Sequence, residues 1–366
     1  MKKIFIYIFT AFLIAGGISI FAGTDKAFSE NENRYLTKLS DVISADILSG
    51  EFQQQFMSYT SDQMPERDNL VAFATAIKKA SGRKDIGGVY LGREGFYFNK
   101  KLDKDINFKR YERNLKKIER VAAEYKDVKV TAMLVPESGS IYCSKLPVNA
   151  EIYNDDAMYD KARGILTKCR LIDLRSRFRE ESSKILYYRT DHHWTLDGAY
   201  IGYEAFAGKK CSYETEKICD DFLGTLYSKV LDKSAEKKVS EGGSLDTVII
   251  PAIEKEVQVM ADGQDIDMFD MSALREKDRY KVFFGGNYGM VDIKSGSNDR
   301  KLVVIKDSFA NCFVPLLTDD YGEIIMIDMR YFSGSIDMLA GDADEILVLY
   351  ELSNFAGDSN IAKLGM

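Results

Sequence analysis

The sequence has 366 residues, a formal net charge of −7 and 45% hydrophobic residues, so it can build one large core or two smaller ones. An acidic chain offers no basic face to nucleic acid, and we expect no nucleic-acid partner. It contains five cysteines without a Cys-x-x-Cys pair and only two histidines. No zinc or redox motif is therefore present, and we expect neither a metal nor a cofactor. Cys211 and Cys219 could close a small loop in an oxidising compartment.

An uncharged apolar run from Ile4 to Ala22 follows two lysines at the amino terminus. The run is long enough to cross a membrane as one helix, and the preceding lysines place the rest of the chain outside the cytoplasm. Ile20 and Phe21 stand where a signal peptidase requires small residues, so we expect residues 1–23 to remain as a single-pass anchor in the cell membrane. The alternative is a cleaved signal segment and a secreted protein.

Residues 24–85 are predicted to form a stalk and a helical lead-in. The stretch 29–36 is polar and lacks hydrophobic periodicity, whereas apolar residues recur three and four apart between 40 and 84. Pro65 interrupts this pattern, because proline removes a backbone donor and restricts the residue before it. We therefore expect two helices, the second running from Asn69 towards Ala80.

From residue 86 to the end, strands alternate with helices, which is typical of an α/β fold with a largely parallel sheet flanked by helices. The predicted strands are 89–91 and 96–98, joined as a hairpin, then 128–135, 170–174, 301–305, 324–327 and 346–349. The predicted helices are 108–125, 163–169, 196–208 and 309–317. Between about 209 and 298 this alternation stops, and short β-like runs occur at 247–251, 257–261 and 280–284. We interpret this segment as a β-rich insertion or lid.

Both histidines and the single tryptophan lie in Asp191-His192-His193-Trp194. If the chain uses an imidazole base, that base must come from this tetrapeptide. Side chains two apart in an extended segment point the same way, so Asp191 can orient His193 through one ring nitrogen while the other accepts a proton. His192 is expected to point elsewhere, towards the cleft rim, as an auxiliary residue. The alternative without catalysis is a polar loop that packs Trp194 in the core.

Ser308 follows the strand pattern 301–305 and precedes the expected helix 309–317. Parallel-sheet proteins place their ligands at this edge, and the first N–H groups of a helix can stabilise an oxyanion there. Serine is also a favoured helix cap, so position alone does not separate the two roles. Taken together with Asp191 and His193, Ser308 is expected to be the nucleophile.

These motifs resemble those of the DHHW protein family, which is named for the tetrapeptide at 191–194. The other matching segments are Ser29–Arg34, Asp62–Arg67, Phe284–Asn287, Ile305–Phe309 and Asp328–Tyr331, so the resemblance covers nearly the whole chain after the anchor. Through this family the sequence is similar to the periplasmic alginate O-acetyltransferases. The resemblance implies an SGNH-hydrolase-like domain over 86–366 and a triad of Asp191, His193 and Ser308.

The order of the motifs departs from that of ordinary SGNH hydrolases, where Gly-Asp-Ser lies near the amino end and Asp-x-x-His near the carboxyl end. Here Ser308 follows the histidines, and Lys306 replaces the usual glycine. The first candidate for the oxyanion hole is the backbone N–H of Ser308. Asn311, Arg330 and Tyr331 are further candidates.

The expected activity is O-acetyl transfer to an exported polysaccharide or cell-wall polymer through an acyl-Ser308 intermediate, with His193 as base and acid in turn. A carbohydrate O-acetyl esterase, which uses water as the acceptor, requires the same triad. A third hypothesis is a catalytically inactive surface module that binds glycans through its aromatic-rich insertion. The resemblance also implies a partner, a multi-spanning membrane O-acyltransferase that brings acetyl groups across the membrane.

An Asp-His-His sequence also marks manganese-dependent phosphoesterases. Those enzymes need further Asp and His ligands from other segments. The chain has no third histidine, so we do not expect that activity.

Overall fold

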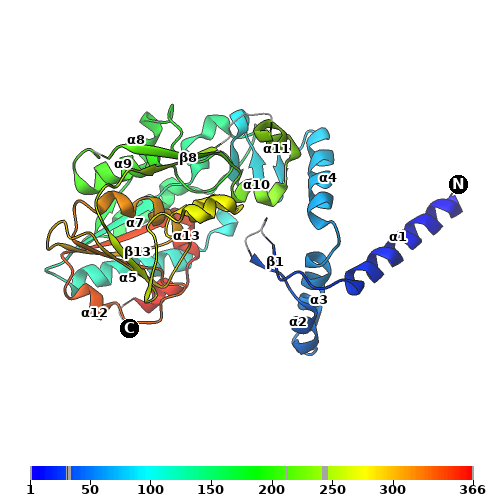
Figure 1. Ribbon diagram of the computed structural model, residues 1–366, viewed down its shortest axis with the longest axis horizontal. Helices are drawn as coiled ribbons and strands as arrows, with labels where there is room; N and C mark the ends of the chain where they lie inside the picture. Colours follow the sequence, from blue (N-terminus) through cyan, green and yellow to red (C-terminus); the bar gives the residue numbers. More distant parts are fainter. Residues whose placement is uncertain (1, 30, 32–33, 212, 241–245, 365–366) are drawn as a thin grey trace.

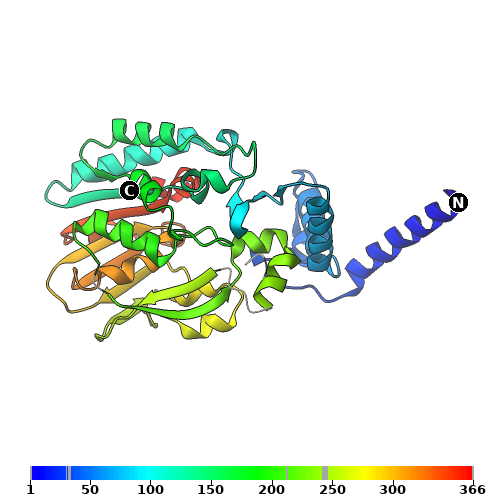
Figure 2. The ribbon, with the colours of Figure 1, turned by 90° about the horizontal axis from the view of Figure 1, so that it is seen from above.

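A computed structural model describes residues 2–29, 31, 34–211, 213–240 and 246–364. Helix α1 (Lys2–Ala22) projects from the body of the protein, and Figures 1 and 2 show the lead-in helices between it and the large domain. It is long and apolar enough to cross a membrane, with a mean hydropathy of 2.3, and almost none of it is buried. The structure is therefore consistent with the expected anchor by length and composition.

The lead-in contains α2 (Leu39–Ser44), α3 (Glu51–Asp62) and α4 (Arg67–Ala80), one helix more than expected. Two of the sequence motifs meet here, because the Arg34 guanidinium donates to both oxygens of Asp62, at 2.9 and 2.5 Å. Gln63 donates to the carbonyls of residues 26 and 37. These contacts hold the polar stretch after α1 against the end of α3.

The large domain is built on an eight-stranded sheet with the order β11-β10-β12-β14-β13-β15-β6-β7. Its strands are β6 (Lys129–Val135), β7 (Arg170–Ile172), β10 (Gln258–Ala261), β11 (Gln264–Asp265), β12 (Met290–Lys294), β13 (Lys301–Lys306), β14 (Glu323–Ile327) and β15 (Glu345–Glu351). Neighbours from β14 to β7 pair in parallel, whereas β12, β10 and β11 add antiparallel strands at one edge. This arrangement confirms an α/β fold with a large, mostly parallel sheet.

Both faces of the sheet are buried, as the strand β13 shows. Leu302 and Val304 belong to one core cluster together with Trp194 and residues of α9 (Leu196–Ala207). Val303 and Ile305 belong to a second cluster on the opposite face, with residues of α5 (Phe108–Glu124), α7 (Asp155–Ile165) and α13 (Leu352–Gly357). Continuous apolar runs are typical of strands in this position, because helices cover them on both sides.

The expected hairpin is confirmed, displaced by one residue in its second strand. β4 (Val89–Leu91) pairs antiparallel with β5 (Tyr97–Asn99), and β3 (Asp85–Ile86) completes a three-stranded sheet. The segment 209–298 is rich in strands, with β8 (Thr215–Phe222) and β9 (Asp246–Pro251) forming a separate pair. The strands β10, β11 and β12 of this segment join the main sheet, so these strands are part of the body of the domain.

Three predicted elements were wrong in type or position. The helix placed at 163–169 is the end of α7, which finishes at Ile165. The helix placed at 309–317 is a pair of short 3₁₀ turns, Ser308–Cys312 and Val314–Leu317, and Pro315 in the second supplies no N–H for a continuous helix. The β-like run at 280–284 begins within a 3₁₀ turn, Arg279–Val282, because a short apolar run does not distinguish a strand from a buried turn. Within the described residues, no disulfide joins Cys211 and Cys219.

Candidate active site

Asp191, His193 and Ser308 form a hydrogen-bonded chain at the carboxyl edge of the sheet. Nδ1 of His193 lies 2.6 Å from Oδ1 of Asp191, and Nε2 lies 2.8 Å from Oγ of Ser308. Asp191 and His193 are buried, whereas Ser308 is partly exposed. The aspartate accepts the Nδ1–H, so the Nε2 lone pair faces the serine hydroxyl, which is the tautomer that a general base requires.

All the hydrogen-bonding capacity of Asp191 is used. Oδ1 also accepts the backbone N–H of His193 at 2.9 Å, and Oδ2 accepts the N–H and the hydroxyl of Thr225 at 2.7 and 2.8 Å. Burial favours the neutral carboxyl, but His192, His193 and these donors hold the pKa of Asp191 well below its usual range. The carboxylate therefore stays ionised at neutral pH.

Thr225, whose N–H and hydroxyl clamp Oδ2 of Asp191, is the first residue of α10 (Thr225–Val230). This helix lies directly against the histidine loop, residues 189–193. The backbone carbonyl of Thr190 accepts the N–H groups of residues 226 and 227, each at 3.0 Å. Gly224 permits this approach, because a Cβ at that position would stand 2.3 Å from Cβ of Asp191. Buried Asp246 holds the other side of the loop by accepting the N–H groups of Arg189 and Thr190 at 2.6 and 2.7 Å.

Two aromatic side chains tie the histidine loop to the serine turn. The ring of Tyr280 stacks on the His193 imidazole at 3.7 Å, and its hydroxyl donates to the carbonyl of Ser308 at 3.1 Å. The indole N–H of Trp194 donates to the carbonyl of Phe309 at 2.8 Å. These contacts fix the His193 imidazole and Ser308 relative to each other.

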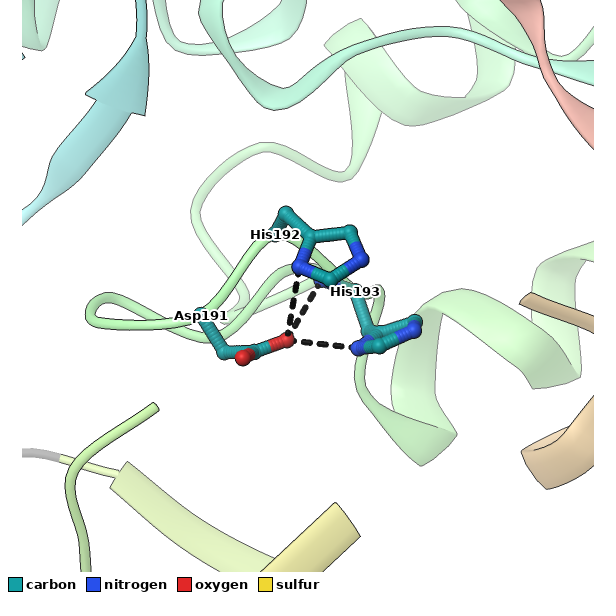
Figure 3. A group of neighbouring side chains, drawn as sticks. All are labelled: Asp191, His192 and His193. Carbon is teal, nitrogen blue, oxygen red and sulfur yellow. Dashed lines mark hydrogen bonds and ion pairs between the residues drawn. The ribbon is translucent and has the colours of Figure 1, made fainter. Parts of the chain in front are cut away.

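The extended-loop argument predicted that His192 points away from the site, and this prediction is wrong. Figure 3 shows its ring beside Asp191, and its Nδ1 lies 3.5 Å from Oδ1 of Asp191 and 2.7 Å from Oγ1 of Thr225. The chain bends through residues 189–193 rather than running extended, so the period of two does not hold there. Burial and the adjacent His193 lower the pKa of His192 to about 3, which keeps the ring neutral.

Donor counting fixes the tautomer of His192. The single hydroxyl proton of Thr225 goes to Asp191, so Nδ1 of His192 must carry a proton to donate to the Thr225 oxygen. His192 therefore supports Asp191 through Thr225 and does not compete for Ser308.

The ligand atoms of Asp191, His192 and His193 lie within 4.8 Å of one another, close enough for one metal ion (Figure 3). Each Nδ1 carries a hydrogen that is directed to an oxygen of the protein, and both oxygens of Asp191 are saturated by N–H and O–H donors. A cation at this point would have to displace these bonds. The donor set fits a proton-transfer site better than a metal site.

The backbone N–H of Ser308 remains a candidate oxyanion donor. Within the described residues it has no hydrogen-bond acceptor, whereas the N–H of Phe309 is bonded to Oδ1 of Asp307 at 3.0 Å. A 3₁₀ turn follows Ser308 in place of the expected helix, so little helix dipole is available. Asp307 shapes this turn, and its Oδ2 accepts the N–H of Glu351 and the side-chain amide of Asn354, at 3.1 and 2.9 Å.

The other predicted oxyanion candidates contact other partners. Asn311 receives the buried ammonium of Lys306 at 2.8 Å and donates to Oδ1 of Asn287 at 3.3 Å. Arg330 forms a two-bond fork with the buried Asp328, at 2.8 and 2.5 Å. Tyr331 is 59% exposed.

Three of the sequence motifs meet at Lys306, and they are Phe284–Asn287, Ile305–Phe309 and Asp328–Tyr331. Its Nζ also donates to Oδ1 of Asn287 at 3.1 Å and lies 3.8 Å from Asp328. Burial lowers the pKa of Lys306 to about 8.

Thr225, Tyr280 and Asp246 were not found from the sequence. Each acts through a contact with a residue more than 25 positions away, and no local spacing marks such a pair. The one available signal was Gly224-Thr225, a glycine before a helix-capping residue type, and that pair is too common to identify a clamp.

The fold and the site define an α/β protein with a Ser-His-Asp chain at the carboxyl edge of a mostly parallel sheet. A model of the DHHW protein family matches residues 130–327, more than half of the sequence, and the chain belongs to that family. No curated protein matches the sequence.

Solved structures share the fold. A DHHW family protein from Eubacterium siraeum DSM 15702 is 22% identical, with a TM-score of 0.61 over 76% of this chain and 96% of that one. Bacillus cereus PatB1, solved with a sulfonyl adduct, is 17% identical, with a TM-score of 0.61 over 75% of this chain and 97% of that one. The O-acetyltransferase domain of Pseudomonas putida AlgJ is 15% identical, with a TM-score of 0.45 over 74% of this chain and 93% of that one.

Proposed function

We propose that this protein is an extracytoplasmic O-acetyltransferase that uses Ser308, His193 and Asp191 to acetylate an exported polysaccharide or cell-wall polymer. The observation that carries the proposal is the His193 imidazole, which is hydrogen-bonded at both nitrogens between a buried carboxylate and a partly exposed serine hydroxyl. The choice of acetyl transfer follows the sequence resemblance to the alginate O-acetyltransferases. A carbohydrate esterase would use the same residues with water as acceptor.

The reaction has two balanced halves. In the first, Oγ of Ser308 attacks the carbonyl carbon of an acetyl ester while Nε2 of His193 takes the hydroxyl proton. The bond to the donor oxygen breaks, and the imidazolium returns the proton to that leaving oxygen. In the second half, a sugar hydroxyl gives its proton to His193 and attacks the acetyl carbon. The bond to Oγ breaks, Ser308 is reprotonated, and the acetylated sugar leaves.

Oxyanion stabilisation is assigned to the N–H of Ser308, with Asn287 as a second donor. Lys306 and Asn311 both donate to Oδ1 of Asn287, so its amide nitrogen is directed away from them. Discrete N–H donors of this kind act on the charge that develops in the transition state.

We also propose that residues 1–23 anchor the protein, that 24–85 form the lead-in, and that 86–366 form an SGNH-hydrolase-like catalytic domain. The apolar helix α1 and the two lysines at its amino end support an outward orientation of the domain. Acetyl groups must then reach Ser308 from outside the cytoplasm, which calls for a membrane O-acyltransferase as the supplying partner.

The proposal is tested with the purified chain, p-nitrophenyl acetate and a sulfonyl fluoride. We expect p-nitrophenol release and a single covalent adduct on Ser308, because sulfonyl fluorides react with activated serine hydroxyls. Ser308→Ala should abolish both. Ser228→Ala removes a buried serine hydroxyl that, among the described residues, bonds only to the backbone carbonyl of Gly224, and it should change neither. An adduct that persists in Ser308→Ala would place the nucleophile elsewhere.

A further inference from the structure

Three adjacent parallel strands end in polar residues at the edge where Ser308 lies. Ser308 follows β13, Glu351 ends β15, and Glu137 lies two residues beyond β6. These strands are direct neighbours, with Glu351 opposite Val135 and Lys306 opposite Leu349. Neighbouring strands are about 4.8 Å apart, so the backbone of Glu137 is about 10 Å along the edge from that of Ser308. A short oligosaccharide covers such a span.

Glu137 is an unexplained buried acid. It is 7% exposed, and its Oε1 has no hydrogen-bond partner within the described part of the chain. Asn99, at the end of β5, bonds to the Glu137 carboxyl through its side chain. Burial raises the pKa of Glu137 to about 7. Buried polar atoms in folded proteins are normally paired, so an unpaired carboxylate oxygen beside a candidate active site marks a place for a ligand group.

Glu137 is linked to the triad through Asn99 and Lys229. The Lys229 ammonium donates to Oδ1 of Asn99 at 3.2 Å, and Lys229 lies one turn after Thr225 on α10, the residue that clamps Asp191. The positive charge of Lys229 acts on both Glu137 and His192. The cluster of Glu137, Asn99 and Lys229 therefore adjoins the histidine loop.

The charge around this cluster disfavours an anionic ligand. The ammonium of Lys101 is already engaged, since it donates to the Ser353 hydroxyl and lies 3.8 Å from Oε2 of Glu351. Glu351 and Asp307 offset the charges of the two lysines, and Glu137, with a pKa of about 7, adds a partial negative charge, so no excess of positive charge remains. A carboxylate, an amide and an ammonium together match the donors and acceptors of sugar hydroxyl groups.

We propose that Glu137, Asn99 and Lys229 form a subsite that binds hydroxyl groups of an uncharged sugar acceptor beside Ser308. The inference rests on the proposed acetyl transfer and names the acceptor site for it. Glu137 accepts a hydrogen bond from one hydroxyl, and the sugar then presents another hydroxyl to the acetyl group on Ser308. Water needs no such contact, so the subsite favours transfer over hydrolysis. Lys229 is on the surface of the domain, and its flexible side chain can move aside to admit the sugar.

The test measures transfer and hydrolysis in one reaction on the full chain in detergent. The donor is p-nitrophenyl acetate, and the acceptors are cellotetraose, tetra-N-acetylchitotetraose and tetragalacturonate. Released p-nitrophenol gives the total turnover, and mass spectrometry gives the acetylated sugar. In Glu137→Gln, the new carbonyl turns to the amide of Asn99, which leaves an N–H donor where Oε1 stood. We expect the ratio of transfer to hydrolysis to fall about tenfold, the usual effect of losing a hydrogen bond to a charged group. Hydrolysis without sugar should stay within about twofold.

Glu345→Gln is the matched control, because Glu345 is also buried, at 3% exposure, but lies at the opposite end of β15. It should leave the ratio unchanged. Lys229→Met, on the surface, gives an independent test if Glu137→Gln does not fold, and it should raise the KM for the neutral acceptors several-fold without affecting hydrolysis.

Several results would overturn the subsite. One is a ratio of transfer to hydrolysis in both variants that equals the wild-type ratio. Another is an equal loss of hydrolysis and transfer. A third is a wild-type chain that hydrolyses the ester but yields no acetylated sugar. A preference for tetragalacturonate would overturn the assignment of an uncharged acceptor. Failure of the wild-type chain to release p-nitrophenol would instead refute the proposed function, and the subsite with it.

Discussion

Asp191→Asn tests the geometry of the triad directly, because the structure determines which way the new amide must turn. The carboxylate receives two donors on each oxygen, from His193 and from Thr225. If the NH₂ group faces Thr225, the Thr225 hydroxyl must accept both this group and the N–H of His192, and its own proton loses its acceptor. If the NH₂ group faces His193, the imidazole can change tautomer and accept through Nδ1. The second orientation leaves fewer buried groups unpaired and is therefore favoured.

The favoured orientation has two measurable costs. His193 then carries its proton on Nε2 and cannot take one from Ser308, so kcat should fall by about 10⁴-fold, as in other triads with this substitution. One backbone N–H, that of His193, faces an NH₂ group, which costs about 1–3 kcal/mol of stability. The folded-state pKa of Asp191 is depressed, so its stabilising effect is present above the unfolded pKa of about 4 and disappears as the pH falls below it. The stability difference from wild type should shrink over the same range.

The assay combines turnover of p-nitrophenyl acetate with urea unfolding followed by the fluorescence of Trp194, the single tryptophan. Asp197→Asn is the control, because Asp197 is exposed at the start of α9 and outside the triad. A kcat for Asp191→Asn within tenfold of wild type would show that Asp191 does not set the tautomer of the base, and the roles assigned to this loop would have to change.

Three further predictions concern the same loop and the anchor. His193→Ala and Ser308→Ala should each lower ester turnover by several orders of magnitude, and the double variant should be little worse. His192→Ala should retain most of the activity. If His192→Ala were inactive and His193→Ala active, the roles of the two histidines would have to be exchanged. Thr225→Val should lower kcat and the urea midpoint of unfolding, because it removes one hydrogen bond to a charged group, worth about 1.5–3 kcal/mol. Thr225→Ser keeps the hydroxyl and should restore both. An equal loss in the two variants would assign the effect to packing. A reporter that requires export should be active when fused after residue 366, and protease should digest the domain in spheroplasts; a protected domain would refute the topology.

The elements that could be predicted from the sequence are those whose burial is continuous or strictly periodic. The strands β6, β13, β14 and β15 are apolar runs buried on both faces, and the amphipathic α5 buries one stripe of residues against the sheet. Such patterns are local, so they survive without knowledge of the tertiary contacts. The failures at 163–169, 280–284 and 309–317 are short segments in which tertiary packing determines the conformation.

That Asp191, His193 and Ser308 come together could be predicted, but the reasons for their geometry could not. Asp191 and His193 do pair, although the period of two that predicted the pairing does not hold in this loop. The loop bends, and its shape comes from Asp246, from Thr225 and from the ring of Tyr280, all supplied by the segment 209–298. The sequence pattern of this segment is typical of an insertion, but in the structure the segment supplies the residues that hold His193 in place.

In the proposed reaction, the absence of the expected helix after Ser308 changes where oxyanion stabilisation must come from. A 3₁₀ turn of five residues has almost no aligned dipole, so individual N–H groups have to supply the stabilisation. The buried position of Lys306 then has a structural explanation. Its buried ammonium, held near Asp328, donates to the side-chain oxygens of both Asn287 and Asn311. Lys306 thereby orients Asn287 at the end of β13, and the charge that would be costly to bury alone is offset by the partners it positions.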